Sequence, residues 1–215
     1  MSLKFTMPVY ITADDDSILA SKYFEKKDYA NAIKHFLLSD KTTITLNNLA
    51  ICYKKIGDHI NMEKYYLLAS NEGYSSAMND LGVYYKKIKN YDEMKKYYLM
   101  AISKGFPDAM YNLGIYFHEV GDYLNMEKYY LMAIKEGIVR AMCNLGAYCQ
   151  QQKHYEKMME YYLMAISHGN GMAMNNLGSF YYEQKDYAMA KKYYLMAMEK
   201  GNDLAKENYE ILKST

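Results

Sequence analysis

The sequence predicts an all-α fold, a right-handed solenoid of stacked antiparallel helix pairs. Three observations lead to this prediction. A pattern of leucine, glycine and paired tyrosines recurs every 32 residues, each period contains two amphipathic helical patterns, and helix-capping residues stand between them. A strict period of this size is typical of solenoids built from two-helix units, in which each unit buries its apolar face against its neighbours.

The first helix of each unit contains a Leu-Gly pair. In the unit that begins near Ala77, Leu81, Gly82 and Tyr85 fall four, five and eight residues after Ala77, on one face of a helix. Glycine inside a helix costs roughly 1 kcal/mol against alanine, so its repetition indicates a geometric need. We expect close approach of the second helix, opposite its tyrosine pair, with Ala20 and Ala50 in the same role in the first two units.

The second helix of each unit contains the tyrosine pair and has caps at both ends. Strong N-cap residues precede it at Asp28, Asp58, Asn90, Asp122 and Asp186, while His154 is a poor cap. Glycine ends it at positions 73, 105, 137, 169 and 201, where a left-handed residue is needed. A turn of about five residues is expected between the two helices of a unit.

These patterns divide the chain. Residues 1–13 alternate apolar and polar side chains, and two interpretations stay open: an extended arm, which lies on the solenoid or reaches a second copy, and a disordered tail. Residues 14–42 form a divergent first repeat whose junction to the next lacks the usual glycine. Five regular repeats are expected at 43–74, 75–106, 107–138, 139–170 and 171–202, followed by a polar capping helix over 203–215.

The motif A-x-x-x-L-G-x-x-x-Y, followed by Y-Y-x-x-A-x-x-x-G, resembles the Sel1-like repeat, a branch of the tetratricopeptide superfamily. Gly105 to Gly114 and Tyr97 to Gly105 follow it closely, although tyrosine replaces the usual tryptophan and the inner turn is about four residues short. The resemblance implies a scaffold or adaptor that brings other proteins together. Similar methionine- and lysine-rich arrays occur in large DNA viruses and AT-rich protists, which implies a viral or AT-rich source.

Composition excludes several classes of function. The net charge of +1 argues against nucleic-acid binding, and no segment is long and apolar enough to predict a membrane span. The three cysteines follow no repeat period, which favours a reducing compartment, the cytoplasm or a host cell's cytoplasm or nucleus, over secretion. The histidines and cysteines form no metal spacing and no nucleophile system, so we expect neither an enzyme nor a cofactor.

The candidate site lies on the first helices, which line the concave face in tetratricopeptide-like stacking. It is expected to hold a peptide or protein segment, with lysines that attract an acidic stretch and a ladder of Asn or Asp residues before each Leu-Gly pair. The ladder has two interpretations: its side chains grip the backbone of a bound peptide, or they tie adjacent repeats together. The candidate residues are Asn48, Lys54, Lys55, Asp80, Lys86, Lys87, Tyr111, Asn112, His118, Asn144, Asn176 and Tyr182.

An alternative function is self-assembly, in which the apolar residues of 1–13 pair between copies of a structural protein. The expected oligomeric state is a monomer or a weak homodimer. Neither the partner nor its pathway can be named from the residues.

Overall fold

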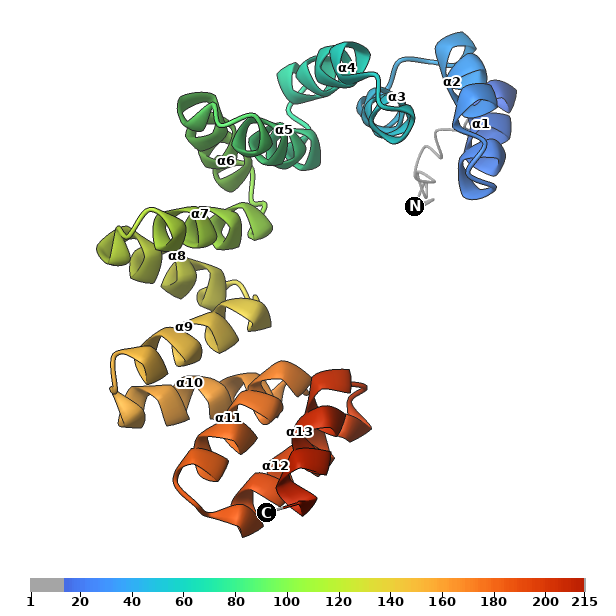
Figure 1. Ribbon diagram of the computed structural model, residues 1–215. Coiled ribbons are helices and arrows are strands. Elements are labelled where there is room, and N and C mark those ends of the chain that lie inside the picture. The colour runs from blue at the N-terminus through green and yellow to red at the C-terminus, as the bar shows by residue number, and fades with distance from the viewer. Residues whose placement is uncertain (1–13, 215) are drawn as a thin grey trace, which may run out of the picture. The chain divides into compact units, whose positions relative to one another are not determined.

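The computed structural model describes residues 14–214, which fold into thirteen α-helices without a strand (Figure 1). The all-α prediction is therefore confirmed for this part of the chain. The helices are α1 (Asp15–Glu25), α2 (Tyr29–Leu38), α3 (Thr43–Ile56), α4 (His59–Asn71), α5 (Ser75–Lys87), α6 (Tyr91–Ser103), α7 (Asp108–Glu119), α8 (Tyr123–Lys135), α9 (Val139–Gln151), α10 (Tyr155–Ser167), α11 (Gly171–Glu183), α12 (Tyr187–Glu199) and α13 (Asp203–Lys213).

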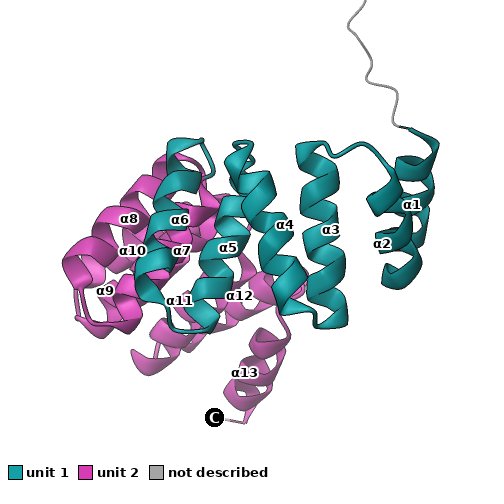
Figure 2. Cartoon of the chain, turned by 90° about the horizontal axis from the view of Figure 1, so that it is seen from above, with its two compact units in different colours: residues 1–106 teal, residues 107–215 magenta. Residues whose placement is uncertain are grey.

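The helices belong to two compact units, one up to Phe106 and one from Pro107 onwards (Figure 2). In the first unit α1 pairs with α2, α3 with α4 and α5 with α6, and each second helix packs against the first helix of the next pair. In the second unit α7–α12 form three pairs in the same manner, and α13 packs against both α12 and α11. The odd-numbered helices before α13 are therefore the first helices of successive pairs.

The expected N-caps form as predicted. The side chains of Asp28, Asp58, Asn90, Asp122 and Asp186 each accept a hydrogen bond from the backbone N–H three residues later. His154 makes no such bond at the start of α10, as expected for a poor cap. A feature that the sequence analysis missed is the asparagine three residues after three of these caps, whose amide donates to the second carboxylate oxygen.

Residues with a left-handed backbone conformation follow both helices of each regular pair. The glycines predicted to end the second helices have φ angles between +74° and +85°. The turns inside the pairs are shorter than predicted, with three residues rather than about five between α5 and α6. A left-handed residue in the turn allows this tight reversal. It is glycine at Gly57 and Gly121, and lysine at positions 27, 89, 153 and 185, where φ is +60° or +61°.

The glycine of each Leu-Gly pair allows close helix packing, as predicted. A Cβ atom on Gly82 would lie 2.5 Å from the ring of Tyr98, a distance that real Cβ atoms do not show. The same clash would occur between Gly114 and Tyr130, Gly146 and Tyr162, and Gly178 and Tyr194. Each of these tyrosines is almost fully buried. Burying a large aromatic side chain offsets the cost of a helical glycine.

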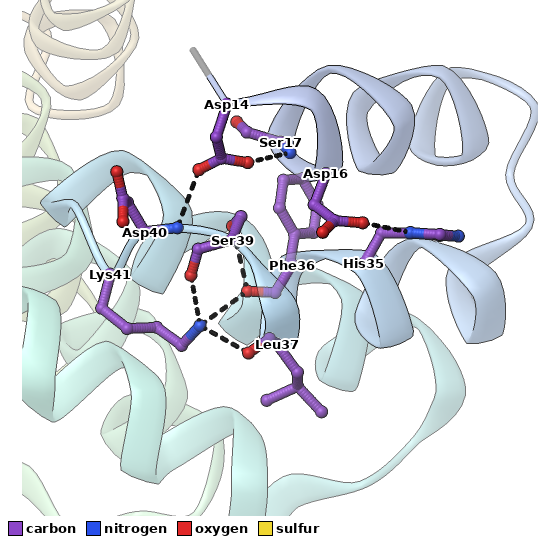
Figure 3. A network of polar contacts seen from close by, with 9 residues as sticks. All are labelled: Asp14, Asp16, Ser17, His35, Phe36, Leu37, Ser39, Asp40 and Lys41. Atoms are coloured by element: carbon purple, nitrogen blue, oxygen red, sulfur yellow. Dashed lines mark hydrogen bonds and ion pairs between the residues drawn. The ribbon is translucent and has the colours of Figure 1, made fainter.

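A polar network closes the junction between the divergent first pair and α3 (Figure 3). The amine of Lys41 donates to the carbonyl oxygens of Phe36, Leu37 and Ser39 at 3.0, 2.7 and 2.6 Å. These carbonyls at the end of α2 have no N–H partner within the helix. In the other pairs a glycine ends the second helix, whereas here the Lys41 amine satisfies the terminal carbonyls. Asp14 caps α1 and also accepts a hydrogen bond of 2.8 Å from the backbone N–H of Asp40.

The expected N-terminal arm, residues 1–13, lies outside the described residues. The division of the chain into an arm, six repeats and a capping helix stays a prediction.

Candidate functional site

The twelve candidate residues all lie on first helices. α3 carries Asn48, Lys54 and Lys55, and α5 carries Asp80, Lys86 and Lys87, all in the first unit. The second unit holds the others: Tyr111, Asn112 and His118 on α7, Asn144 on α9, and Asn176 and Tyr182 on α11. The structure therefore divides the predicted site into two sets, each on neighbouring first helices of one unit.

The lysines of the first unit have differing surroundings. Lys54, Lys55 and Lys87 are exposed, and Lys86 is half-buried. The amine of Lys54 lies 3.3 Å from the carboxylate of Asp80, and this ion pair joins α3 to α5. A pair this exposed contributes little to stability because solvent screens it. It leaves the α3–α5 surface with more positive than negative side chains among the candidates.

Other residues of the Asn/Asp ladder contact the preceding repeat, as Asp80 does through Lys54. The amide of Asn144 donates to the hydroxyl of Tyr130 at 3.1 Å and, more weakly, to that of Tyr111 at 3.4 Å. The amide nitrogen of Asn176 lies 3.9 Å from the sulfur of Cys143, and a similar bond of 2.9 Å joins Asn208 to Asn175. At these steps the geometry supports the interpretation that the ladder ties repeats together.

Asn208 is a ladder residue that the sequence analysis missed. It stands 32 residues after Asn176, on α13, so the period itself was the signal that could have identified it. Its bond to α11 shows that α13 continues the stacking of the repeats before it.

Shallow hollows on the surface lie between successive first helices. The hollow between α1 and α3 has a volume of about 370 Å³, that between α7 and α9 about 190 Å³, and that between α11 and α13 about 250 Å³. Four candidate residues line them: Asn48 in the first, His118 and Asn144 in the second, and Tyr182 in the third. Hydroxyl groups that the sequence analysis did not single out join them, among them those of Ser17 and Tyr194.

A larger hollow of about 540 Å³ lies elsewhere, at the turn between α9 and α10. It is lined by five consecutive residues, Lys153–Lys157, so a single turn forms it without a facing helix. It contains no candidate residue, and a ligand bound there would be contacted from one side only.

The nucleophilic side chains near the site are not activated. Burial raises the pKa of the Cys143 thiol to about 11 and that of the Cys52 thiol to about 12, so both remain protonated at neutral pH. His118 is exposed, and the centre of its ring lies 6.2 Å from the ring centres of Tyr123 and Tyr148. Burial also raises the pKa of Tyr130 to about 12, although the amide of Asn144 opposes this.

Within residues 14–214, no group of three or more His, Cys, Asp or Glu side chains is placed to hold a metal ion. None of the helices in this part of the chain combines the length and apolar character that crossing a bilayer requires. The arrangement can therefore offer hydrogen-bonding groups, aromatic rings and charges to a ligand.

Comparison with protein families finds tetratricopeptide repeats in three segments. Family models of the tetratricopeptide repeat match residues 75–103, 139–167 and 171–204. The predicted tetratricopeptide character is confirmed for these segments, and the narrower Sel1-like assignment stays a prediction. No curated protein sequence matches the chain.

Solved structures share the fold. A protective antigen of uropathogenic Escherichia coli, c5321, which displays an SLR fold, aligns with 93% of this chain at a TM-score of 0.73 and 21% identity. The alignment covers 48% of c5321, so this chain spans about half of that protein. PilF of Pseudomonas aeruginosa aligns over 91% of this chain and 95% of its own, with a TM-score of 0.68 and 15% identity. A chain of the APC/C hetero-tetramer Cut9–Hcn1 aligns over 92% of this chain and 42% of its own length, with a TM-score of 0.62 and 13% identity. These likenesses confirm the all-helical repeat solenoid.

Proposed function

We propose that this chain is a non-catalytic protein–protein interaction scaffold whose first helices bind a peptide or a segment of a partner protein. The observation that carries the proposal is the recurrence of hollows between successive first helices, lined by hydroxyl, amide and aromatic groups. Concave sites that combine apolar walls with a few polar groups are the usual form of ligand sites. The tetratricopeptide match supports the proposal, because this repeat commonly mediates protein–protein interaction, and so does the assembly of Cut9 with Hcn1.

The partner's binding segment is acidic in this proposal. Lys54, Lys55, Lys86 and Lys87 lie on α3 and α5, and Asp80 forms an ion pair with Lys54. A cluster of lysines raises the local concentration of an acidic partner and speeds its association. The ladder contributes less to binding than the sequence suggested, since Asn144 and Asn176 already bond within the protein.

Charge reversal of the first-helix lysines tests this function. A variant with Lys54, Lys55, Lys86 and Lys87 each changed to Glu is compared with a control in which four lysines of the α2, α4 and α6 region of the same unit are reversed: Lys34, Lys64, Lys96 and Lys104. Fluorescence anisotropy measures the binding of a labelled glutamate-rich peptide and of a lysine-rich peptide of equal length. Circular dichroism verifies that both variants fold.

The expected result is binding of the glutamate-rich peptide that the first-helix reversal abolishes and the control retains, with affinity that falls as salt rises. Equal loss in both variants would show attraction to overall charge and would contradict a site on the first helices. Pull-down from lysate of the source cell with the same variants then identifies the client. Light scattering of the intact protein tests the proposed monomer or weak homodimer.

A further inference from the structure

The first helices share a leucine that is buried in every pair except the first. Leu49, Leu81, Leu113, Leu145 and Leu177 are at most 1% exposed. They pack against the second helix of the preceding pair, as Leu49 does against Ile33 and Phe36 of α2. The counterpart in α1 is Leu19, which is 37% exposed. No helix precedes α1 in the described residues, so the face that would receive a preceding pair is open.

Beside Leu19, the ladder position of α1 is occupied by an apolar residue. Later repeats have Asn or Asp there, and at Asn144 and Asn176 this side chain bonds to the preceding repeat. In α1 the residue is Ile18, which is 44% exposed and can stabilise a neighbour only by apolar contact. Because Ile18 cannot form a hydrogen bond through its side chain, the open face of α1 is suited to an apolar neighbour.

The open face is also narrow. Asp15 and Lys22, both exposed, stand one turn before and one turn after the apolar pair Ile18 and Leu19. In four later repeats the position of Asp15 is a buried alanine: Ala77, Ala109, Ala141 and Ala173. A charged side chain at this position opposes the docking of a complete helix pair, because burying an unpaired charge is costly. The strip that remains fits an extended segment.

The segment immediately before α1 has the required chemistry and reach. Leu3, Phe5, Met7, Val9 and Ile11 alternate with polar residues, so an extended backbone would place them on one side. Thirteen residues can span about 43 Å, whereas the eleven residues of α1 extend over about 16 Å. Ile18 is the fourth residue of α1 after its N-cap Asp14, a position that often packs against an apolar residue preceding the cap.

We propose that residues 3–11 cover the Ile18–Leu19 strip of the same molecule, in the place that a preceding repeat takes elsewhere in the chain. The segment then closes the apolar end of the repeat array from within the molecule. A second copy of the chain is not needed for this closure. Of the two uses of an extended arm, covering its own protein and pairing between copies, the proposal selects the first.

Disulfide trapping in the full-length chain tests the placement. One variant combines Val9→Cys with Lys22→Cys, at the end of the open strip. The matched control combines Val9→Cys with Ser21→Cys, which lies one residue away but lines the hollow facing α3. Both retain the three native cysteines, which are buried. After mild oxidation, non-reducing electrophoresis and mass spectrometry of peptides measure intramolecular and intermolecular links.

The proposal predicts an intramolecular link that forms several-fold faster with Lys22→Cys than with Ser21→Cys. A faster link to position 21, or equal rates at both positions, would overturn it, because the segment would then occupy the hollow or sample both faces. Links found only between molecules would overturn it in favour of pairing between copies. A variant with Phe5→Ser, Val9→Ser and Ile11→Ser gives an independent readout: its midpoint of thermal unfolding should fall, and an unchanged midpoint would also count against the proposal.

Discussion

At the scale of single residues, the helical glycines and the N-cap aspartates each have an identifiable effect on stability. The glycine of each Leu-Gly pair is destabilising by helix propensity alone, yet its missing Cβ leaves room for a buried tyrosine ring. The N-cap aspartates act locally in a similar way, since each satisfies a backbone N–H that the helix leaves without a partner. Both effects can be measured by substitution.

The change Gly146→Ala should destabilise the protein by roughly 1–3 kcal/mol, because the new methyl group would lie 2.5 Å from the Tyr162 ring. Propensity alone predicts the opposite sign, a gain of about 1 kcal/mol. Urea denaturation gives the free energy of unfolding. The control is Ala147→Gly at the exposed next position, which should cost only about 1 kcal/mol. A more stable Gly146→Ala protein would contradict the close-approach explanation.

Stability should fall when the N-cap aspartates become protonated. Hydrogen bonds from the asparagine three residues later lower the pKa of three of these carboxyls below the ordinary value: Asp28, Asp58 and Asp122. A lowered folded-state pKa gives stability that is present above about pH 4 and is lost as the pH falls through the folded-state pKa.

We expect the midpoint of thermal unfolding to drop on acidification below about pH 4, and to drop less when all three aspartates are changed to Asn, which caps without ionising. Circular dichroism at a series of pH values measures both proteins. Parallel curves would show that other carboxylates cause the acid sensitivity.

At the scale of elements, the turns decide how closely two helices of a pair follow each other. Their left-handed residue is glycine in two pairs and lysine in the others. A side chain in this conformation brings Cβ near the following carbonyl oxygen, at a cost of about 1 kcal/mol, which glycine avoids. Each lysine turn is therefore less stable than the same turn with glycine at the left-handed position.

The change Lys89→Gly should stabilise the protein by up to about 1 kcal/mol, since position 89 has a φ of +61°. The reciprocal change Gly121→Lys, at a φ of +77°, should destabilise it by a similar amount. Denaturant unfolding of the two single variants measures both. Loss of stability with Lys89→Gly would mean that contacts of the lysine side chain outweigh backbone strain.

At the scale of the molecule, stability comes from contacts between neighbouring pairs, as in other repeat arrays. In the second unit Ala205 of α13 belongs to one buried cluster with Met174, Tyr194 and Ala197 of the preceding pair. α13 thus covers an apolar surface of the α11–α12 pair that would otherwise face water.

Deletion of residues 203–215 should loosen α11 and α12 far more than the first unit, because each pair depends mainly on its neighbours. Hydrogen exchange followed by mass spectrometry locates the loss of protection. A control with Leu204→Ser and Ile211→Ser, both 54% exposed, should leave protection nearly unchanged. A uniform loss along the whole chain would indicate a single cooperative unit instead.

The sequence by itself determined the helices, their caps and the close approach at the glycines. These features are local or repeat with the period, so each is visible within one or two units of the sequence. The inner turns are shorter than the sequence predicted, because lysine at position 89 gives no sign of its left-handed backbone. A surface lysine has the same place in the repeat with or without a bound partner, so the period does not determine what the protein binds.

Only the tertiary structure decided which side chains meet across repeats. Asn144 could have faced a ligand, but stacking places its amide against Tyr130 of the preceding pair. Lys54 lies beside Asp80, and Lys41 reaches the end of α2. The period fixes the position of a residue within its own repeat, whereas its partners depend on the distance and rotation between repeats. This distance and rotation follow from the packing of the buried side chains, which only the structure shows.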